Sequence, residues 1–176
     1  MSVGDMREIK IDKVVVNIGI GKAGEPLENT ASFLEKLAGK KPVITKARSR
    51  NPTWNLRKGL PIGVKVTFRG AEAEEFLRKA FEAVGNKISK NSFDGRGNFS
   101  FGVAEYIDFP GVKYDPKVGM LGFDVCVSLK RPGYRVMRRR VARSKIGKRH
   151  IITNEEAQKF VSDKYGVNLF GRWEGE

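Results

Sequence analysis

Residues 62–69 alternate strictly between apolar side chains and polar or small ones, and this alternation constrains the fold more than any other segment does. The apolar positions are Ile62, Val64, Val66 and Phe68, and the positions between them are Gly63, Lys65, Thr67 and Arg69. Successive side chains of a β-strand point to opposite faces, so the segment predicts a strand with one apolar face and one cationic face. Such a strand belongs in a sheet that is covered on one face and open on the other.

Other segments have the alternation of strands or the spacing of amphipathic helices. Further strands are expected at residues 9–18, 41–45, 99 to about 109, and 123–130. Helices are expected from Pro26 to a stop at Gly39, from Ala71 to Val84, and from a capping box at Thr153 and Glu156 to Gly166. The expected buried positions of the first helix are Leu27, Ala31, Leu34, Leu37 and Ala38. These elements predict an α+β fold, in which a largely antiparallel sheet of four to five strands carries helices on one face.

The length of 176 residues and the apolar fraction of 40% fit one compact domain. We expect a single domain over residues 1–170 with a long basic loop at 46–61 and a basic insertion at 130–150, followed by a flexible tail at 171–176. Residues 1–10 lack the apolar segment of a signal peptide. The sequence also lacks the roughly 20 consecutive apolar residues that cross a bilayer, so neither secretion nor a membrane is expected.

The net charge of +14 is distributed unevenly along the chain. Residues 36–69 contain ten Lys or Arg and no acid, and residues 130–150 contain ten more and again no acid. A heat-adapted surface would interleave the two signs, whereas unopposed cationic runs repel themselves unless a polyanion neutralises them. The pattern therefore predicts a nucleic acid as the partner, with the uncovered face of the sheet as its binding face.

Composition and spacing argue against several kinds of enzyme. Cys126 and His150 are the only residues of their types, which rules out an internal disulfide and a zinc site of Cys and His ligands, and no third group orients them as a nucleophile pair. The pattern Gly19-x-Gly21-x-x-Gly24 follows a strand and precedes a helix, as in dinucleotide-binding folds, but the acid expected about 20 residues later is missing. A phosphate-preferring variant that uses Arg48 stays an alternative.

Two aromatic features have alternative interpretations. Trp54 lies in the middle of the basic loop, where it could stack on a base or anchor the loop against the core. Phe99 and Phe101 alternate as in the aromatic strand of an RNA-recognition motif, but the spacing is one residue out of register, which favours two core residues.

Five segments, taken in order, carry a family resemblance. They are VVVNIGIG at 14–21, KPVITKAR at 41–48, RKGLPIGVKVT at 57–67, SFDGRGN at 92–98 and GFD at 122–124. Together they resemble the family of the large-subunit ribosomal protein numbered five, which binds 5S rRNA. The resemblance covers about residues 9–167, and Arg131-Pro132-Gly133 with the following basic stretch is similar to the archaeal and eukaryotic branch.

The resemblance implies a structural protein of the cytoplasmic ribosome with no enzymatic activity, cofactor or metal. It implies that the chain helps to attach 5S rRNA in the central protuberance of the large subunit. The implied partners are 5S rRNA, large-subunit rRNA, tRNA in the peptidyl site, a head protein of the small subunit and other proteins of the central protuberance. Another kind of basic RNA-binding module stays an alternative.

The resemblance and the charge pattern together name candidate contacts. The positions that match RNA-contacting residues of the family are Asn17, Lys40, Trp54, Thr67 and Arg69, and Lys40 stands where the bacterial pattern has an amide. Charge adds Lys46, Arg48 and Lys65 as phosphate ligands of 5S rRNA. The segment similar to the family's tRNA-proximal loop offers Arg48, Arg50, Asn51, Trp54, Arg57 and Lys58. The insertion offers additional rRNA contacts at Arg135, Arg138, Arg139, Arg140, Arg143, Lys148 and Arg149, and we expect residues 130–150 to be mobile in the free protein.

Overall fold

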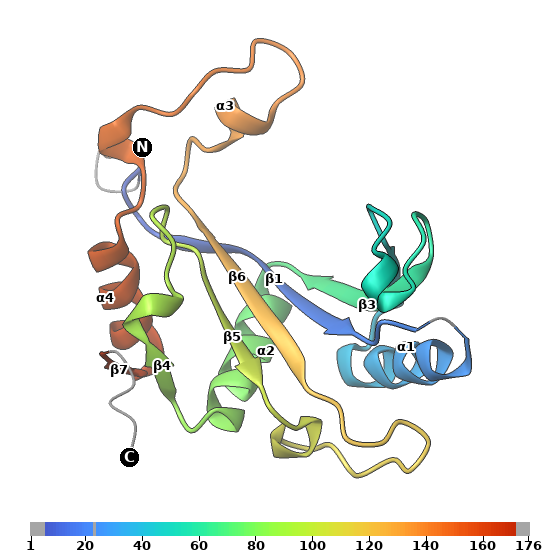
Figure 1. Cartoon of the computed structure of the whole chain (residues 1–176). Coiled ribbons are helices and arrows are strands. Elements are labelled where there is room, and N and C mark those ends of the chain that lie inside the picture. Colours follow the sequence, from blue (N-terminus) through green and yellow to red (C-terminus); the bar gives the residue numbers. More distant parts are fainter. Residues whose placement is uncertain (1–5, 23, 172–176) are drawn as a thin grey trace.

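The computed structural model describes residues 6–22 and 24–171. Within these residues, five strands form one antiparallel sheet in the order β2-β3-β1-β6-β5 (Figure 1). Their bounds are Lys10–Gly19 (β1), Val43–Lys46 (β2), Pro61–Phe68 (β3), Phe99–Val103 (β5) and Phe123–Lys130 (β6). The expected antiparallel sheet is therefore confirmed. The expected tail lies outside the described residues, except for Gly171.

The connectivity of the sheet excludes the dinucleotide-binding alternative. β1 pairs with β3 on one side and with β6 on the other, and both pairings are antiparallel. A dinucleotide-binding fold requires parallel strands on either side of its first crossover. The glycines that follow β1 therefore form only the connection to the first helix.

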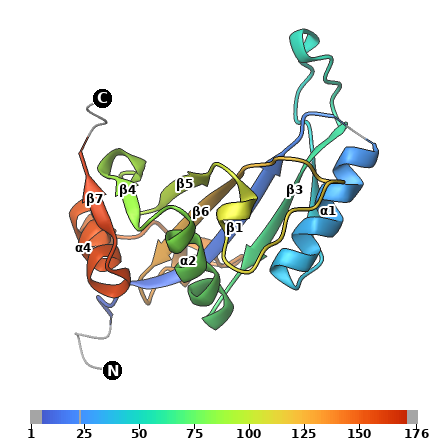
Figure 2. The same cartoon turned by 90° about the horizontal axis from the view of Figure 1, so that it is seen from below.

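Three helices of at least three turns pack against the strands. Their bounds are Glu25–Ala38 (α1), Ala71–Ala83 (α2) and Asn154–Tyr165 (α4), and a single turn, Arg135–Arg138 (α3), lies in the insertion. Helices α1 and α2 lie on one side of the main sheet, and α4 lies beside its β5 edge (Figure 2). The predicted ends of α1 and α4 are confirmed, because residues at the ends themselves determine them. Gly39 ends α1 in a left-handed conformation with φ 62°, and Thr153 and Glu156 form the predicted capping box of α4.

The core lies between the helices and the apolar face of the sheet. In α1, Leu27 and Leu34 are buried as expected, but the fully buried stripe also includes Thr30 and Phe33, while the three other expected positions are only half-buried. Thr30 is tolerated there because its hydroxyl donates to the Pro26 carbonyl at 2.8 Å.

The aromatic strand β5 belongs to the core. The Phe99 side chain is buried, and Phe101 packs half-buried against the core, its ring 5.4 Å from that of Phe81. The interpretation of the two phenylalanines as core residues is thus confirmed. The expectation that this strand reaches about residue 109 is wrong, because it ends at Val103 and the chain turns so that Tyr106 enters the core.

Short elements complete the fold. The strands Lys87–Ser89 (β4) and Asn168–Phe170 (β7) form a parallel pair beside α4, which the sequence analysis did not predict. Three residues are too few to show an alternating pattern. The 3-10 helices within the described residues are Pro52–Trp54, Lys90–Ser92, Tyr106–Asp108 and Lys148–His150.

Candidate nucleic-acid interface

The face of the sheet that points away from α1 and α2, called the open face below, brings together residues from all five strands. One row crosses the sheet in register and contains Val43, Lys65, Asn17, Asp124 and Gly102. Lys65 is exposed and Asn17, its direct neighbour, is half-buried. The row also carries an acid, Asp124, which the sequence did not suggest as a contact, and its one cation, Lys65, lies on the β3 side of Asn17.

The floor of the open face is flat because its side chains are small. The neighbouring row contains Thr67, Val15, Cys126 and Ser100. At the other end of β3, Gly63 pairs with Gly19. A Cβ atom on Gly63 would lie 2.6 Å from the Ile18 carbonyl oxygen and 2.9 Å from Thr45 Oγ1, so a side chain at position 63 would collide with β1 and β2. The open face therefore offers a flat surface to a bulky ligand.

Not every predicted 5S rRNA contact lies on this face. Lys46 ends β2, and Thr67 is exposed on β3 beside the row of Lys65. Lys40 lies apart from them, because its ammonium forms an ion pair with Glu72 of α2 and lies 5.9 Å from the ring centroid of Phe68 on the covered face. The structure thus brings Lys65, Asn17 and Thr67 together and places Lys40 elsewhere.

The loop over residues 47–60, called the tryptophan loop below, projects from the end of the sheet (Figures 1 and 2). Asn51 shapes its tip, since the Asn51 side chain accepts a hydrogen bond from the Thr53 N–H at 3.1 Å and its backbone pairs with Leu56. The Trp54 side chain is 70% exposed, so the alternative of an anchor packed against the core is wrong. The predicted tRNA-proximal residues Arg48, Arg50, Arg57 and Lys58 share this loop with Trp54.

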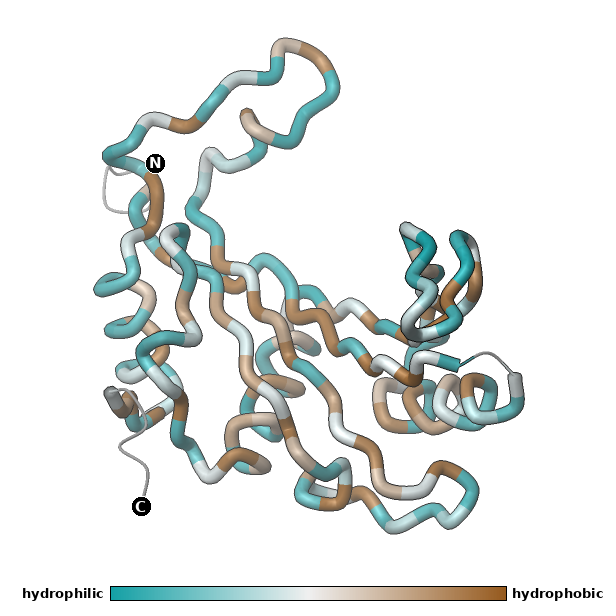
Figure 3. The backbone as a smooth tube through the Cα atoms, in the orientation of Figure 1, coloured by the Kyte–Doolittle hydropathy of each residue, from teal (hydrophilic) through white to brown (hydrophobic). Residues whose placement is uncertain are grey.

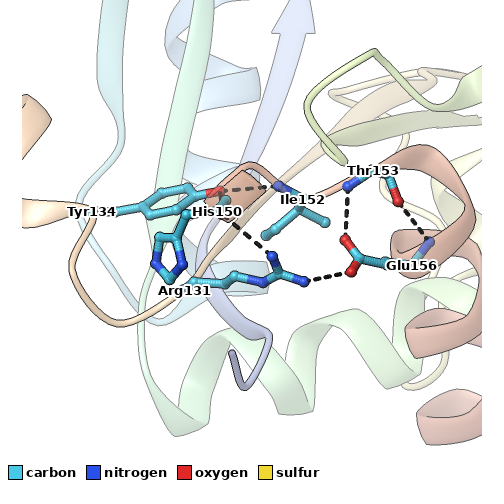
Figure 4. Close-up of polar contacts among 6 residues, drawn as sticks. All are labelled: Arg131, Tyr134, His150, Ile152, Thr153 and Glu156. Carbon is cyan, nitrogen blue, oxygen red and sulfur yellow. Dashed lines mark hydrogen bonds and ion pairs between the residues drawn. The ribbon is translucent and has the colours of Figure 1, made fainter. Parts of the chain in front are cut away.

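The insertion is closed at its base by a polar network (Figure 4). Arg131, only 5% exposed, forms an ion pair with Glu156 of α4 at 2.8 Å. Arg131 and Tyr134 both donate to the backbone carbonyl of His150, at 3.4 and 3.3 Å. The Ile152 N–H donates in turn to the Tyr134 hydroxyl at 3.2 Å. The two ends of the insertion are therefore held to each other and to α4.

A second anchor joins the insertion to the rim of the sheet. The Asp12 side chain is 3% exposed and lies at a bulge in β1, and its carboxylate contacts Arg138 at 2.6 Å, Lys130 at 3.2 Å and Arg69 at 3.9 Å. Burial alone would raise the pKa of Asp12, but the hydrogen bonds and charges of Arg138 and Lys130 lower it below its ordinary value. Sequence reasoning missed Asp12, although an acid between apolar Ile11 and the rest of the strand was a visible signal.

The remaining predicted contacts of the insertion lie in and around its outer part. Arg135 and Arg138 belong to α3, and Arg139, Arg140, Arg143, Lys148 and Arg149 follow it. In this part Val141 is 74% exposed, and Figure 3 shows the insertion mostly in hydrophilic colours. Three of the ten cations of the insertion, Lys130, Arg131 and Arg138, thus pair with acids from outside their run, Asp12 and Glu156. Mobility of residues 130–150 stays a prediction.

Cys126 and His150, which the sequence offered as a nucleophile pair, lie in different parts of the structure. Cys126 lies on the open face, where burial and then the charge of Asp124 raise its pKa, opposite to what an activated thiol requires. His150 is at the base of the insertion, where its Nε2 is 2.8 Å from the Pro132 carbonyl oxygen. Among residues 6–22 and 24–171, no group of three or more His, Cys, Asp or Glu could hold a metal, and no helix could span a membrane.

Comparisons with known proteins agree along the length of the chain. Residues 5–57 match the family described as ribosomal protein L5, and residues 61–163 match the model of the C-terminus of the same ribosomal family. The chain is 48% identical over 169 residues to the large ribosomal subunit protein uL5 of Sulfurisphaera tokodaii, covering 96% of each chain. It is 50% identical over 165 residues to the uL5 protein of Nanoarchaeum equitans, covering 93% of this chain and 97% of the relative. The uL5 protein of Methanococcus aeolicus is 46% identical over 167 residues, with 93% and 92% covered.

Proposed function

The chain belongs to the ribosomal protein L5 family, and we propose on this basis that it binds 5S rRNA through the open face of its sheet. Membership makes it a structural, non-enzymatic constituent of the large subunit of the cytoplasmic ribosome. Within the subunit, its role is to help attach 5S rRNA in the central protuberance.

One observation carries the 5S rRNA proposal, the registered pair of Lys65 and Asn17 on an uncovered flat face. The wide, shallow minor groove of an RNA helix presents 2′-hydroxyls and base edges to a flat surface. Lys65 neutralises a phosphate and fixes the position of the RNA, while the short side chains of Asn17 and Thr67 contact sugar hydroxyls and base edges. Lys46, Arg48 and Arg69 extend the phosphate contacts along the same side of the sheet.

Lys40 has a smaller part in this proposal than the family resemblance implies. Its ammonium is engaged by Glu72 on the helix-covered side, and an RNA phosphate would have to displace that carboxylate. We therefore expect Lys40 to contribute less to the affinity for 5S rRNA than Lys65, which is exposed on the open face.

The tryptophan loop is proposed to approach tRNA in the peptidyl site. An exposed indole can stack on a base or a ribose, and its cationic neighbours in the loop can neutralise phosphates. The outer part of the insertion is proposed to contact large-subunit rRNA, because a run of cations is stabilised when a polyanion neutralises it. Contacts with a small-subunit head protein and with other central-protuberance proteins are proposed from family membership alone.

A titration of fluorescent 5S rRNA tests the proposed function. The purified protein is added at several salt concentrations, with tRNA and an unrelated structured RNA as competitors. We expect tight binding that resists both competitors, because specific contacts add to the phosphate contacts. Binding that any RNA displaces equally, with a steep salt dependence, would show charge-driven binding only and would contradict the 5S assignment.

A further inference from the structure

Asp12 occupies an unusual position for an acidic residue in this chain. The pairing of β1 with β6 shifts in register between Ile11 and Lys13, so Asp12 is the additional residue of a β-bulge. Its side chain is nearly fully buried, yet it lies among three cations that come from three different segments. Arg69 follows β3, Lys130 ends β6, and Arg138 ends α3 in the insertion. The bulge therefore joins the sheet to the insertion.

The cluster carries more positive charge than Asp12 can neutralise. One carboxylate meets three cations, and the side chains of Arg69, Lys130 and Arg138 remain 62%, 42% and 46% exposed. A pocket of about 350 Å³ lies beside Lys130 and Arg138, and its lining also includes Asp12 and Tyr134. Arg69 does not line this pocket but lies 3.9 Å from the Asp12 carboxylate. An anion that enters this pocket meets N–H groups that Asp12 holds in a fixed geometry, and preorganised donors lose little entropy on binding.

We propose that Asp12 is a positioning residue that assembles Arg69, Lys130 and Arg138 into one binding site for a phosphate group of the RNA. The inference rests on the proposed function and adds to it a site that joins the open face to the insertion. Asp12 acts through the cations and does not contact the phosphate, because two like charges repel each other.

The substitution Asp12→Asn separates this role from simple electrostatics by the sign of its effect. Asparagine has nearly the same shape but removes one negative charge from a protein of net charge +14. By overall charge alone, the variant would bind RNA more tightly and with a steeper salt dependence. The positioning role predicts that the variant binds RNA about tenfold more weakly, which corresponds to the loss of about one charge-assisted hydrogen bond. It also predicts that the slope of log affinity against log salt concentration falls by about one, as expected when one phosphate contact is lost.

Asp163→Asn is the matched control. Asp163 is an exposed acid of α4 that lies outside the open face, and within the described residues it forms no ion pair. Its removal changes the net charge by the same amount without releasing a cation, so we expect RNA binding that equals or slightly exceeds that of the wild type. The positioning role would be overturned if Asp12→Asn bound RNA as tightly as Asp163→Asn, with an undiminished salt slope.

A loss of folded protein is distinguished from a loss of positioning. Circular dichroism melting gives the folded fraction of each variant, and a reduced folded fraction lowers apparent affinity without changing the salt slope. Arg138→Gln provides a second variant, because its half-exposed side chain can be replaced without opening the core. We expect it to lower the salt slope by about one, and to reduce the additional effect of Asp12→Asn when the two are combined. Wild-type affinity and slope in Arg138→Gln would contradict the site.

The same experiment distinguishes a failure of the proposed 5S rRNA binding from a failure of the proposed phosphate site. Wild-type protein that does not prefer 5S rRNA over tRNA would overturn the proposed function. The comparison of Asp12→Asn with Asp163→Asn would still decide the phosphate site, since every RNA used carries phosphates.

Discussion

At the scale of single residues, we propose that the open face combines one residue that binds any RNA with residues suited to one RNA. Lys65 is a flexible cation that can follow any phosphate, whereas Asn17 is a short, half-buried amide held by two neighbouring strands. Strict alternation along β1 and β3 was sufficient to predict that both residues point away from the core. The division of roles between them follows from their chemistry.

This division predicts different consequences for two substitutions. We expect Lys65→Ala to weaken binding to 5S rRNA, tRNA and an unrelated RNA alike and to lower the salt slope by roughly one. Asn17→Ala should mainly reduce the preference for 5S rRNA and leave the salt slope unchanged. The measurement is a salt series of binding titrations with each RNA, and equal losses for both variants on every RNA would contradict the division.

The ion pairs of Asp12 could not be predicted from the sequence, because the residues that form them are distant along the chain. Arg138 lies 126 positions along the chain, and only the folded sheet and insertion bring the two side chains together. A hydrophobic pattern can show that an acid interrupts a strand, but it does not identify the cations that neutralise it.

The lowered pKa of Asp12 predicts how its contribution to stability depends on pH. Because the folded-state pKa is below the unfolded-state value of about 3.9, the charged carboxylate stabilises the fold above that value. This contribution is lost as the pH falls through the folded-state pKa. We expect Asp12→Asn to have a lower free energy of unfolding than wild type at pH 7, and the difference to shrink below pH 4. Urea unfolding across this pH range measures it, and a difference that does not change with pH would contradict the role of the charge.

At the scale of elements, the helix and strand ends that were predicted correctly are those determined by neighbouring residues in the sequence. α1 and α4 end at Gly39 and Gly166 as expected, because a left-handed glycine ends a helix by its own conformation. The ends set by tertiary contacts were missed. β5 ends early because Tyr106 packs into the core, and β4 forms only because β7 pairs with it.

The structure of the insertion also depends on contacts between residues that are distant in the sequence. Ten cations without an acid indicate a segment that repels itself, but the acids that hold its base lie in β1 and α4, far away in the sequence. We infer that the base is fixed and that mobility is confined to the outer part around residues 139–147.

Glu156→Ala tests this view of the insertion. The substitution removes the partner of the buried Arg131 and half of the capping box of α4, so the base loosens. We expect trypsin to cleave residues 131–149 of the variant faster than those of wild type, and 5S rRNA to slow the cleavage in both. Glu155→Ala, an exposed neighbour in the same helix turn, is the control and should resemble wild type. Resistance of this stretch in free wild type would contradict a mobile outer part.

At the scale of the whole molecule, the insertion and the tryptophan loop project from opposite ends of β1 (Figure 1). The insertion emerges near the start of β1, where Lys10 pairs with Lys130, and the tryptophan loop emerges near its end, where Gly19 pairs with Gly63. The open face therefore lies between two basic projections. This arrangement suits a folded RNA that is contacted at several places along its length.

The measurement that tests the account most directly uses the single cysteine of the chain. Cys126 lies on the open face, next to Val15 and Ser100 and one row from Asn17. Its rate of reaction with a maleimide, at one fixed pH, is compared with and without 5S rRNA. The control is the Cys126→Ser protein with Ser32→Cys, which places the only thiol at an exposed position of α1.

If RNA binds at the open face, 5S rRNA slows the modification of Cys126 at least several-fold, in proportion to the fraction of protein bound. The thiol at position 32 stays as reactive as in the free protein. An unchanged rate at Cys126 under saturating RNA, with protection at position 32 instead, would contradict the central claim.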